Sequence, residues 1–198
     1  MARPRAQDYD DKRAAILAGA AKLFAADGFD RTSMNDIAQA LGLSKALLYH
    51  YYRAKDELLF DVIRTHLGDL VEAVAAADDP HAAPETRFGV IISTIIECYR
   101  GADSRHKVQI NHLAHLPAHQ QAELKGYERR LVEIMSAVVR KLHPRLHPAK
   151  IRPLTMTIFG ALNWKYMWFR ENGPMAHAAY AALLTRLFLA GIRAEPEE

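Results

Sequence analysis

The chain has 198 residues, of which 50% are hydrophobic and 25% charged, a composition typical of a folded globular protein and not of a disordered one. A single cysteine, Cys98, excludes an internal disulfide framework and a cysteine-based zinc finger. The charged start has no apolar run behind it, and no stretch approaches the roughly 18 apolar residues that span a bilayer, so we expect a cytoplasmic protein without a signal peptide or a membrane partner.

The formal net charge is +3, and the positive excess is concentrated in one segment. Residues 104–153 contain ten Lys or Arg and three Asp or Glu, whereas residues 1–60 contain nine and eight. A basic excess favours an anionic partner. This distribution indicates such a partner for the second half of the chain, and it does not locate a DNA-binding site in the first.

The first predicted element is a helix over residues 10–26, where apolar residues recur at helical spacing. Asp27-Gly28 follows, and a glycine at that point favours a C-cap. Thr32 or Ser33 then begins a short helix that runs through Leu41. Asp36 stands where a capping box from Ser33 requires an acidic residue.

A second short helix follows a glycine turn. Gly42 ends the preceding helix, and Ser44 caps a helix that runs to about Tyr51. Two short helices joined by a four-residue turn with glycine form the helix-turn-helix pattern. The sequence therefore predicts a three-helix unit at the start of the chain.

Helical spacing assigns an inner and an outer face to this pair of helices. The inner set is apolar and comprises Ile37, Ala38, Leu41, Leu43, Leu48 and Tyr52. The outer set on the second helix comprises Lys45, Ala46, Leu47, Tyr49 and His50. An outward patch of this composition suits the major groove of DNA. Basic, phenolic and imidazole groups can bond phosphate oxygens, and small or branched apolar groups can touch thymine methyls.

The predicted DNA-contact set assigns a role to each kind of side chain. Lys45, Tyr49, His50 and Lys55 are expected on phosphates, and Ala46 and Leu47 on thymine. The set also includes the residues at the helix starts, Thr32, Ser33 and Ser44.

The rest of the chain also reads as helical, without sustained period-2 alternation and without an Asn-Gly or Asp-Gly hairpin signal. Pro153 is expected in the first turn of its helix, where a missing N–H costs little. The predicted helices cover residues 55–77, 84–101, 104–116, 117–142, 150–171 and 174–194. The fold class is therefore all-α, with about nine helices.

The stretch "FAADGFDRTSMNDIAQALGLSKALLYHYYRAKDELL" resembles the DNA-binding region of the TetR family of bacterial repressors. The positions that fit its pattern are Phe24, Gly28, Thr32, Ile37, Ala38, Gly42, Leu48, Tyr49, Lys55 and Leu58. The match covers about residues 12–60 in motif detail, and the helical layout fits the full chain. Two positions depart from the pattern. Leu47 replaces a small or hydroxyl residue, and Tyr52 replaces Phe, so a buried Tyr52 needs a partner for its hydroxyl.

The resemblance implies a homodimer that binds a palindromic operator and is released by a small-molecule effector. It implies a DNA-binding domain over residues 1–54 and a ligand-binding and dimerisation domain over residues 55–198. Arg3 and Arg5 precede the first predicted helix and are expected to form either a groove-following arm or a disordered basic tail.

Large apolar residues between positions 84 and 170 exceed what a thin helical bundle needs for its own core. Each could be core or pocket lining, and the sequence does not separate the two. The candidates for an effector pocket are Ile92, Ile96, Tyr99, Ile110, Leu113, Leu116, Tyr127, Leu131, Met135, Met156, Phe159, Asn163 and Trp164.

The stretch "GALNWKYMWFRENG" resembles the eighth helix of TetR-type regulators that sense acyl-CoA thioesters. The resemblance rests on Asn163, Trp164, Trp168, Phe169 and Gly173. It implies an acyl-CoA or aryl-CoA effector. The basic excess of residues 104–153 agrees with the phosphate charges of coenzyme A, although a solvated helix face would explain that excess equally well.

The last two predicted helices are expected to form the dimer interface. Small residues there permit close approach of two backbones, and neighbouring large ones supply apolar area. The small residues are Gly160, Ala161, Ala178, Ala182 and Gly191, and the large ones are Leu184, Phe188 and Ile192.

Other functions have weaker support in the sequence. There is no glycine-rich phosphate loop, no G-x-S-x-G and no Cys-x-x-Cys, so we expect no enzyme, no catalytic residue and no cofactor. The alternative is a metal-responsive regulator that uses His112, His115 and His119, which fall at spacings of three and four. Pro117 interrupts that series. A structural helical adaptor would leave the outward patch from Lys45 to His50 unexplained.

Overall fold

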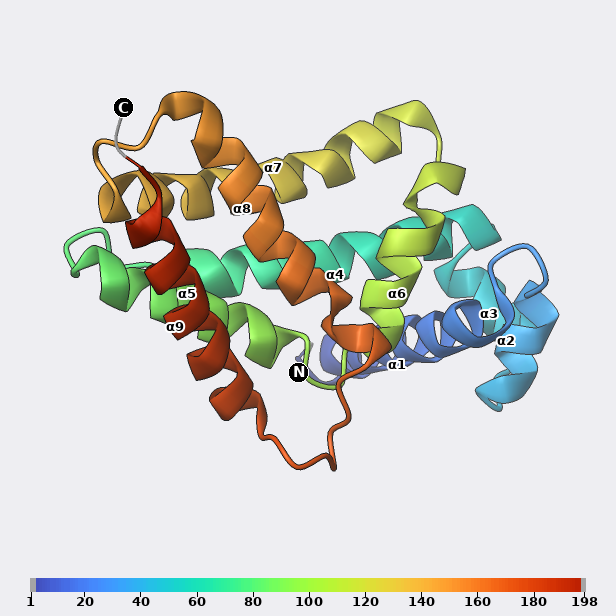
Figure 1. Cartoon of the computed structure of the whole chain (residues 1–198). Helices are drawn as coiled ribbons and strands as arrows, with labels where there is room; N and C mark the ends of the chain where they lie inside the picture. Colours follow the sequence, from blue (N-terminus) through green and yellow to red (C-terminus); the bar gives the residue numbers. More distant parts are fainter. Residues whose placement is uncertain (1–2, 197–198) are drawn as a thin grey trace. The chain divides into compact units, whose positions relative to one another are not determined.

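The computed structural model describes the backbone of residues 3–196 and the side chains of residues 8–196. Within this range the protein has nine α-helices, two short 3-10 helices and no strand, which confirms the predicted all-α class (Figure 1). The helices are α1 (Arg3–Asp27), α2 (Met34–Ala40), α3 (Lys45–Tyr51), α4 (Lys55–Ala77), α5 (Pro84–Cys98), α6 (Asp103–His112), η1 (Leu113–His115), α7 (Ala118–Leu142), α8 (Pro148–Asn163), η2 (Trp164–Met167) and α9 (His177–Ala194). None of the helices within the described range is long and apolar enough to cross a membrane.

The chain forms two compact units that interleave along the sequence. One contains the chain up to His66 together with Ala102–Leu124, and the other contains Leu67–Gly101 together with the chain from Lys125 onward. The helix-turn-helix pair therefore shares its unit with α6 and η1. The predicted domain boundary after residue 54 concerns function and stays a prediction.

The first unit is built around α1, whose buried side chains lie at helical spacing. Ile16, Ala20 and Phe24 are each at most 1% exposed, and Ile37 of α2 and Leu48 of α3 are fully buried. Helix α6 packs along α1, and α2 packs on both α1 and α3. This arrangement presents the short helix α3 on a rigid support.

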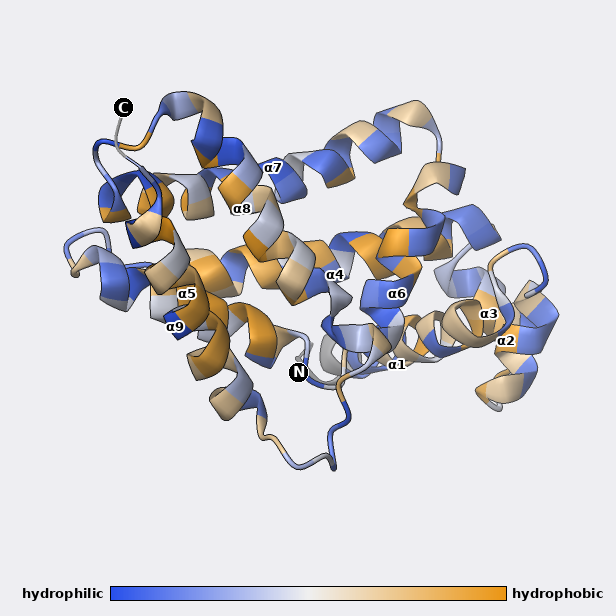
Figure 2. Ribbon diagram, viewed as in Figure 1, coloured by the Kyte–Doolittle hydropathy of each residue, from blue (hydrophilic) through white to orange (hydrophobic). Residues whose placement is uncertain are grey.

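The second unit has one apolar core, to which α4, α5, α7, α8 and α9 all contribute. Helix α9 packs along α5, and α8 also contacts α5. Figure 2 shows apolar stretches on α5 and α9. The buried members of the core are Leu70, Val74, Phe88, Ile91, Ile92, Ile95, Ile96, Tyr99, Leu131, Met135, Val138, Val139, Leu146, Ile158, Phe159, Leu162, Tyr180, Ala181, Leu184 and Ile192.

Several helix ends differ from the prediction. Helix α1 begins at Arg3, seven residues earlier than expected, and α5 ends at Cys98. Helix α8 begins at Pro148, where the His147 Nδ1 accepts from the Ala149 amide at 3.2 Å, so Pro153 lies in the second turn and not in the first. His147 supplies the cap, and Pro148 supplies a preset φ angle at the first helical position. The sequence interpretation had assigned that first-turn role to Pro153.

Candidate DNA-binding site

The segment between α1 and α2 is shaped by one glycine and one threonine. Gly28 has φ +90, in the left-handed region that favours glycine, and its amide donates to the Phe24 carbonyl at 3.1 Å. The Thr32 hydroxyl then donates to the Gly28 carbonyl at 2.8 Å. This confirms the predicted C-cap, and it shows that the buried Thr32 side chain holds the turn.

Both helices of the pair are capped as predicted. Ser33 and Asp36 form a reciprocal capping box at the start of α2, with the Ser33 amide donating to Asp36 Oδ2 at 2.8 Å. Gly42 has φ +63 in the turn, and the Leu47 amide donates to the Ser44 hydroxyl at 3.1 Å at the start of α3. Since these caps satisfy amides that the first turn of a helix leaves free, they fix where each short helix begins.

The predicted inner face is mostly confirmed. Ile37 and Leu48 are 0% exposed, and Ala38 and Tyr52 are 4% exposed. Leu41 and Leu43 are only half-buried. The two helices are thus held together by a small apolar core, and the leucines of the turn lie at its edge.

The outer face of α3 consists of exposed side chains of mixed chemistry, as expected. Lys45, Ala46, Tyr49 and His50 are exposed, and Tyr49 retains 40% of its accessible surface. The Lys45 ammonium lies 5.8 Å from the centre of the Tyr49 ring. Their assignment to DNA stays a prediction.

Leu47 differs from its predicted state, because it is half-buried and not a bare outward side chain. It lines a cavity of about 80 Å³ together with Lys12, Ala15, Ile16, Leu41, Leu43 and Tyr51. Part of its side chain therefore faces α1 across this cavity. A base contact by Leu47, which stays a prediction, would use only the part that remains accessible.

Lys55 has an internal role that the sequence did not reveal. Its ammonium donates to the Phe29 carbonyl at 2.7 Å and lies 4.2 Å from the centre of the Phe29 ring. It thereby ties the start of α4 to the α1–α2 connection. An ammonium has three N–H donors, so a phosphate contact by Lys55 stays a prediction beside this structural contact.

A carboxylate in α4 supplies the partner that Tyr52 was expected to need. The Tyr52 hydroxyl donates to Asp61 Oδ2 at 3.0 Å, and Arg13 of α1 donates to the same oxygen. Arg64 donates to Asp61 Oδ1 through Nε at 3.1 Å and through a terminal nitrogen at 2.8 Å. The sequence pointed to a partner for Tyr52 but not to Asp61, because residues 13, 52 and 61 meet only in the folded chain.

The electrostatics of this cluster favour a charged Asp61. Burial raises the pKa of the Asp61 carboxyl, but hydrogen bonds from Arg64, Arg13 and Tyr52 outweigh burial and hold that pKa below its usual value. Burial, followed by the Asp61 charge, raises the pKa of the Tyr52 hydroxyl, which therefore stays a donor.

An aromatic contact joins the far end of α3 to α1. The rings of Tyr9 and Tyr51 stack with centres 4.7 Å apart. Helix α1 already includes Arg3 and Arg5 in its backbone, which replaces the expected arm or disordered tail with a helix. The side chains of Arg3 and Arg5 lie outside the described residues.

Comparison with known proteins supports the helix-turn-helix interpretation, and the matches extend beyond it into the rest of the chain. Residues 16–62 match the family described as bacterial regulatory proteins, tetR family, and residues 81–192 match the tetracyclin repressor-like C-terminal domain. The chain belongs to the TetR family. Members of this family are transcriptional regulators.

Individual relatives agree with this assignment. A TetR-family transcriptional regulator from Bordetella parapertussis 12822 shares 32% identity and a TM-score of 0.88, over 96% of this chain and 100% of that one. The transcriptional repressor KstR2 of Rhodococcus jostii (strain RHA1) is 30% identical over 128 residues, which is 61% of each protein. AibR, solved with isovaleryl coenzyme A and operator DNA, has a similar fold, with 24% identity, a TM-score of 0.77, and coverage of 88% of this chain and 96% of AibR.

The histidine series of this TetR-family protein does not form a metal centre. The rings of His112 and His115 lie 5.2 Å apart, and His115 Nε2 lies 3.6 Å from Asp30 Oδ2. Burial, followed by the neighbouring His115, lowers the pKa of His112. Across residues 8–196, no group of three or more His, Cys, Asp or Glu side chains is placed to hold a metal ion. The described residues therefore offer the metal-responsive alternative no such site, and the two rings instead pack near Phe29.

The predicted effector residues of this TetR-family protein fall into two groups. Ile92, Ile96, Tyr99, Leu131, Met135 and Phe159 lie together in the core of the second unit. The Tyr99 hydroxyl donates to Asn163 Oδ1 at 2.8 Å. Tyr127 is half-buried, and Trp164 is 60% exposed. Ile110 and Leu113 belong to the other unit, with Ile110 47% exposed. Pocket lining by these residues stays a prediction.

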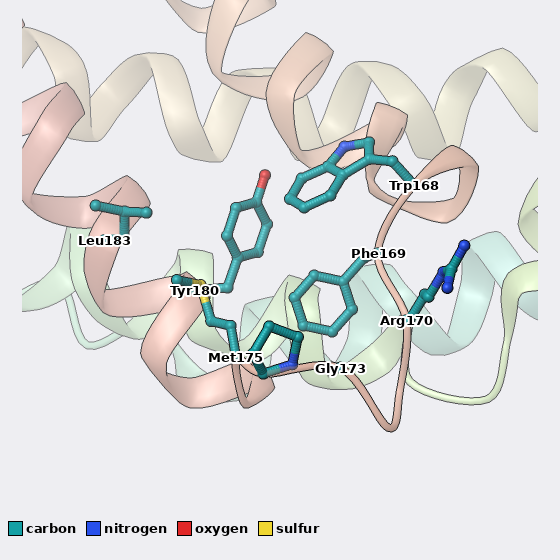
Figure 3. Close-up of a pocket in the computed structure, with 8 residues that line it drawn as sticks. Trp168, Phe169, Arg170, Gly173, Met175, Tyr180 and Leu183 are labelled. Atoms are coloured by element: carbon teal, nitrogen blue, oxygen red, sulfur yellow. The ribbon is translucent and has the colours of Figure 1, made fainter.

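A cavity of about 340 Å³ in the second unit is lined by the segment that connects η2 to α9 and by α9 itself. Figure 3 shows Trp168, Phe169 and Tyr180 with their rings turned toward one another. Trp168 and Phe169 lie 5.2 and 5.4 Å from the Tyr180 ring centre. The remaining lining residues are Arg170, Gly173, Pro174, Met175 and Leu183. Three of the residues that carry the acyl-CoA resemblance, Trp168, Phe169 and Gly173, thus line an apolar cavity.

Proposed function

We propose that this TetR-family protein is a ligand-responsive repressor that binds a palindromic operator as a homodimer. The outer face of α3 carries the DNA part of the proposal. Lys45, Ala46, Tyr49 and His50 are exposed there, while Leu48 and Tyr52 anchor the helix from behind. A helix with one buried and one polar exposed face is what major-groove reading requires.

Selection of bound sequences from a pool of random DNA duplexes tests this part directly. The expected product is a two-fold symmetric site whose half-sites are centred about 10 base pairs, or a multiple of that, apart. Affinity for it should fall steeply with salt, because phosphate contacts release counterions. A pool that emerges without any enriched symmetric sequence would contradict the proposal.

The dimer part is supported by exposed apolar and small residues on α8 and α9. Met156 is 48% and Leu187 59% exposed. A Cβ added at Gly160 or Gly191 would meet no atom within 4 Å, so another backbone can approach there. Leu184 and Ile192, however, are buried in their own core and supply no area to a partner, contrary to the sequence interpretation.

The substitution Leu187→Arg tests the dimer. It places a charge in the proposed interface, so light scattering should report a monomer, and operator binding should weaken because two half-sites are no longer joined. Val90→Arg is the matched control, since Val90 is an exposed apolar residue on α5, at 37%. A Leu187→Arg protein that remains a dimer would remove α9 from the proposed interface.

We further propose an acyl-CoA or aryl-CoA thioester as the effector. The apolar cavity beside Trp168 is large enough for a short acyl or aryl group, since small-molecule pockets begin at about 300 Å³. Arg170 at the lining of the cavity provides attraction for the phosphates, and the basic excess of residues 104–153 favours an anionic ligand in general. The fold is compatible with such a ligand, because AibR binds isovaleryl coenzyme A.

A DNA-release titration with matched compounds tests the effector. Each CoA thioester is compared with its free acid and with free CoA, and only the thioester should release the duplex. Trp168→Ala should shift the release curve to higher ligand concentration, while Val90→Ala, at an exposed residue of α5 that does not line the cavity, serves as control. Release by the free acid at equal concentration would exclude a role for the CoA phosphates.

A further inference from the structure

Helix α3 is too short to keep its structure and orientation without contacts to the rest of the protein. It has seven residues, and isolated helices shorter than about 12 residues are marginal in water. Its position therefore depends on the contacts at its two ends and on its buried face. Ser44 caps the first end, Leu48 occupies the core, and Tyr52 follows directly after the last helical residue.

Tyr52 is fastened at the second end by both backbone and side chain. Its amide donates to the Leu48 carbonyl at 3.0 Å, and its hydroxyl donates to Asp61 at 3.0 Å. A phenylalanine would fill the same buried space but would make no bond to Asp61. A hydrogen bond to a charged acceptor is stronger and more directional than one between neutral groups.

Asp61 in turn is held by two arginines from different helices. Arg13 lies in α1, and Arg64 lies one turn further along α4. The Asp61 side chain is 15% exposed, so its bonds are partly shielded from water. A single carboxylate of α4 thus connects the end of α3 to the longer helices α1 and α4.

We propose that Asp61 is a positioning residue for DNA recognition, which acts through the Tyr52 hydroxyl to set the angle of α3. The inference rests on the proposed function, since it takes the outer face of α3 as the base-reading surface. Base-edge contacts require an accurate helix angle, whereas phosphate contacts carry no sequence information and tolerate a shift. Loss of the Tyr52–Asp61 bond therefore lowers affinity for the operator more than affinity for unrelated DNA.

The substitution Tyr52→Phe tests this with the loss of one oxygen atom. In the free protein, amide hydrogen exchange over residues 45–52 should become several-fold faster while α5 is unchanged. Affinity for the selected operator should fall about tenfold, as for loss of a hydrogen bond to a charged group. Affinity for a scrambled duplex of equal length should stay the same. Asp61→Ala, which removes the acceptor, should behave alike, and the double variant should be no worse than the more affected single variant.

Arg64→Gln is the control within the cluster. It removes two bonds to Asp61 but keeps those from Tyr52 and Arg13, so operator preference should persist. Either of two results for Tyr52→Phe would overturn the inference. One is an amide hydrogen exchange rate in α3 equal to that of the wild type, and the other is an unchanged ratio of the affinities for the operator and the scrambled duplex. A wild-type protein without operator preference would refute the proposed function. Amide hydrogen exchange in α3 of Tyr52→Phe would still decide whether Asp61 anchors the helix.

Discussion

Two lysines in and near α3 carry the same charge but have different partners. Lys45 is exposed, with its ammonium near the Tyr49 ring, whereas Lys55 is half-buried and donates to the Phe29 carbonyl. Removal of Lys55 would disturb the α1–α2 connection as well as any phosphate contact. Lys45 is therefore the better probe of DNA charge contacts.

We expect Lys45→Ala to weaken binding to all duplexes alike. Loss of one phosphate contact should lower the slope of log affinity against log salt by about 0.9. Fluorescence anisotropy at four salt concentrations measures this slope. Lys22→Ala, an exposed lysine of α1 outside the predicted contact set, should leave the slope unchanged. Equal slopes for the wild type and Lys45→Ala would remove Lys45 from the interface.

We expect Leu47→Ala to have two separate effects. Loss of its packing beside the small cavity should lower the free energy of unfolding by roughly 1 kcal/mol, less than for a fully buried leucine. Loss of its methyl contact should relax base preference at one position of each half-site. Urea unfolding and site selection measure the two effects independently.

Leu43→Ala separates these effects, because Leu43 is half-buried and lines the same cavity but lies in the turn. Leu43→Ala should lower the free energy of unfolding as Leu47→Ala does, but it should leave the base preference of the selected sites unchanged. If both variants alter the profile in the same way, Leu47 acts through packing and does not touch a base.

At the scale of elements, a buried ion pair closes the connection between α4 and α5. Arg87 donates to both oxygens of Asp78, through Nε at 2.7 Å and a terminal nitrogen at 2.8 Å. The two side chains are 6% and 13% exposed. Asp78→Ala leaves the guanidinium buried without its partner, so the free energy of unfolding should fall by about 3 kcal/mol.

The exposed pair between Glu85 and Arg193 provides the contrast. It is equally short, at 2.7 Å, but its side chains are 44% and 58% exposed. Glu85→Ala should therefore leave the free energy of unfolding nearly unchanged. Thermal unfolding of both variants measures the difference, and similar losses would contradict the role assigned to burial.

Local signals allowed the sequence to predict elements whose ends carry a cap. The starts of α2 and α3 were predicted correctly, because the Ser33 and Ser44 side chains lie within three residues of the amides they bind. The start of α4 at Lys55 was also predicted correctly, with Asp56 and Glu57 in its first turn. The end of α8 was placed too late, since the switch to a 3-10 turn at Trp164 has no comparable local signal.

The candidate sites were predictable only where a face of one helix defines them. The outer face of α3 followed from helical spacing. Core and pocket residues share that spacing, so Ile92 and Met135 could not be separated from true cavity lining such as Tyr180. The partner of Tyr52 depends on a contact between distant parts of the chain, which periodicity does not encode.

At the scale of the whole molecule, stability should depend on pH through a buried histidine. His66 Nε2 lies 3.4 Å from His106 Nδ1, and burial, followed by the neighbouring His106 and Arg105, lowers the pKa of His66 to about 3. The unfolded chain takes up this proton near pH 6.5, whereas the folded chain resists it down to about 3. The contribution of His66 to stability is therefore fully present above pH 6.5 and is lost as the pH falls toward 3.

Between pH 7 and pH 5 this histidine should remove about 2 kcal/mol from the free energy of unfolding. Urea unfolding at both pH values measures the loss. His66→Gln, which cannot titrate, should show a smaller loss, and His119→Gln, at an exposed position, should match the wild type. An unchanged pH dependence in His66→Gln would assign the effect to another group.

Oxidation of the methionine side chains can report whether the protein forms the proposed dimer. Met156, Met167 and Met175 are 48%, 56% and 39% exposed in the single chain and lie on α8, η2 and the segment before α9. Met34 and Met135 are buried, at 8% and 0%. Mild peroxide converts accessible thioethers to sulfoxides. If α8 and α9 meet a partner, Met156 should oxidise slowly in the assembled protein and rapidly in Leu187→Arg, while Met135 resists in both.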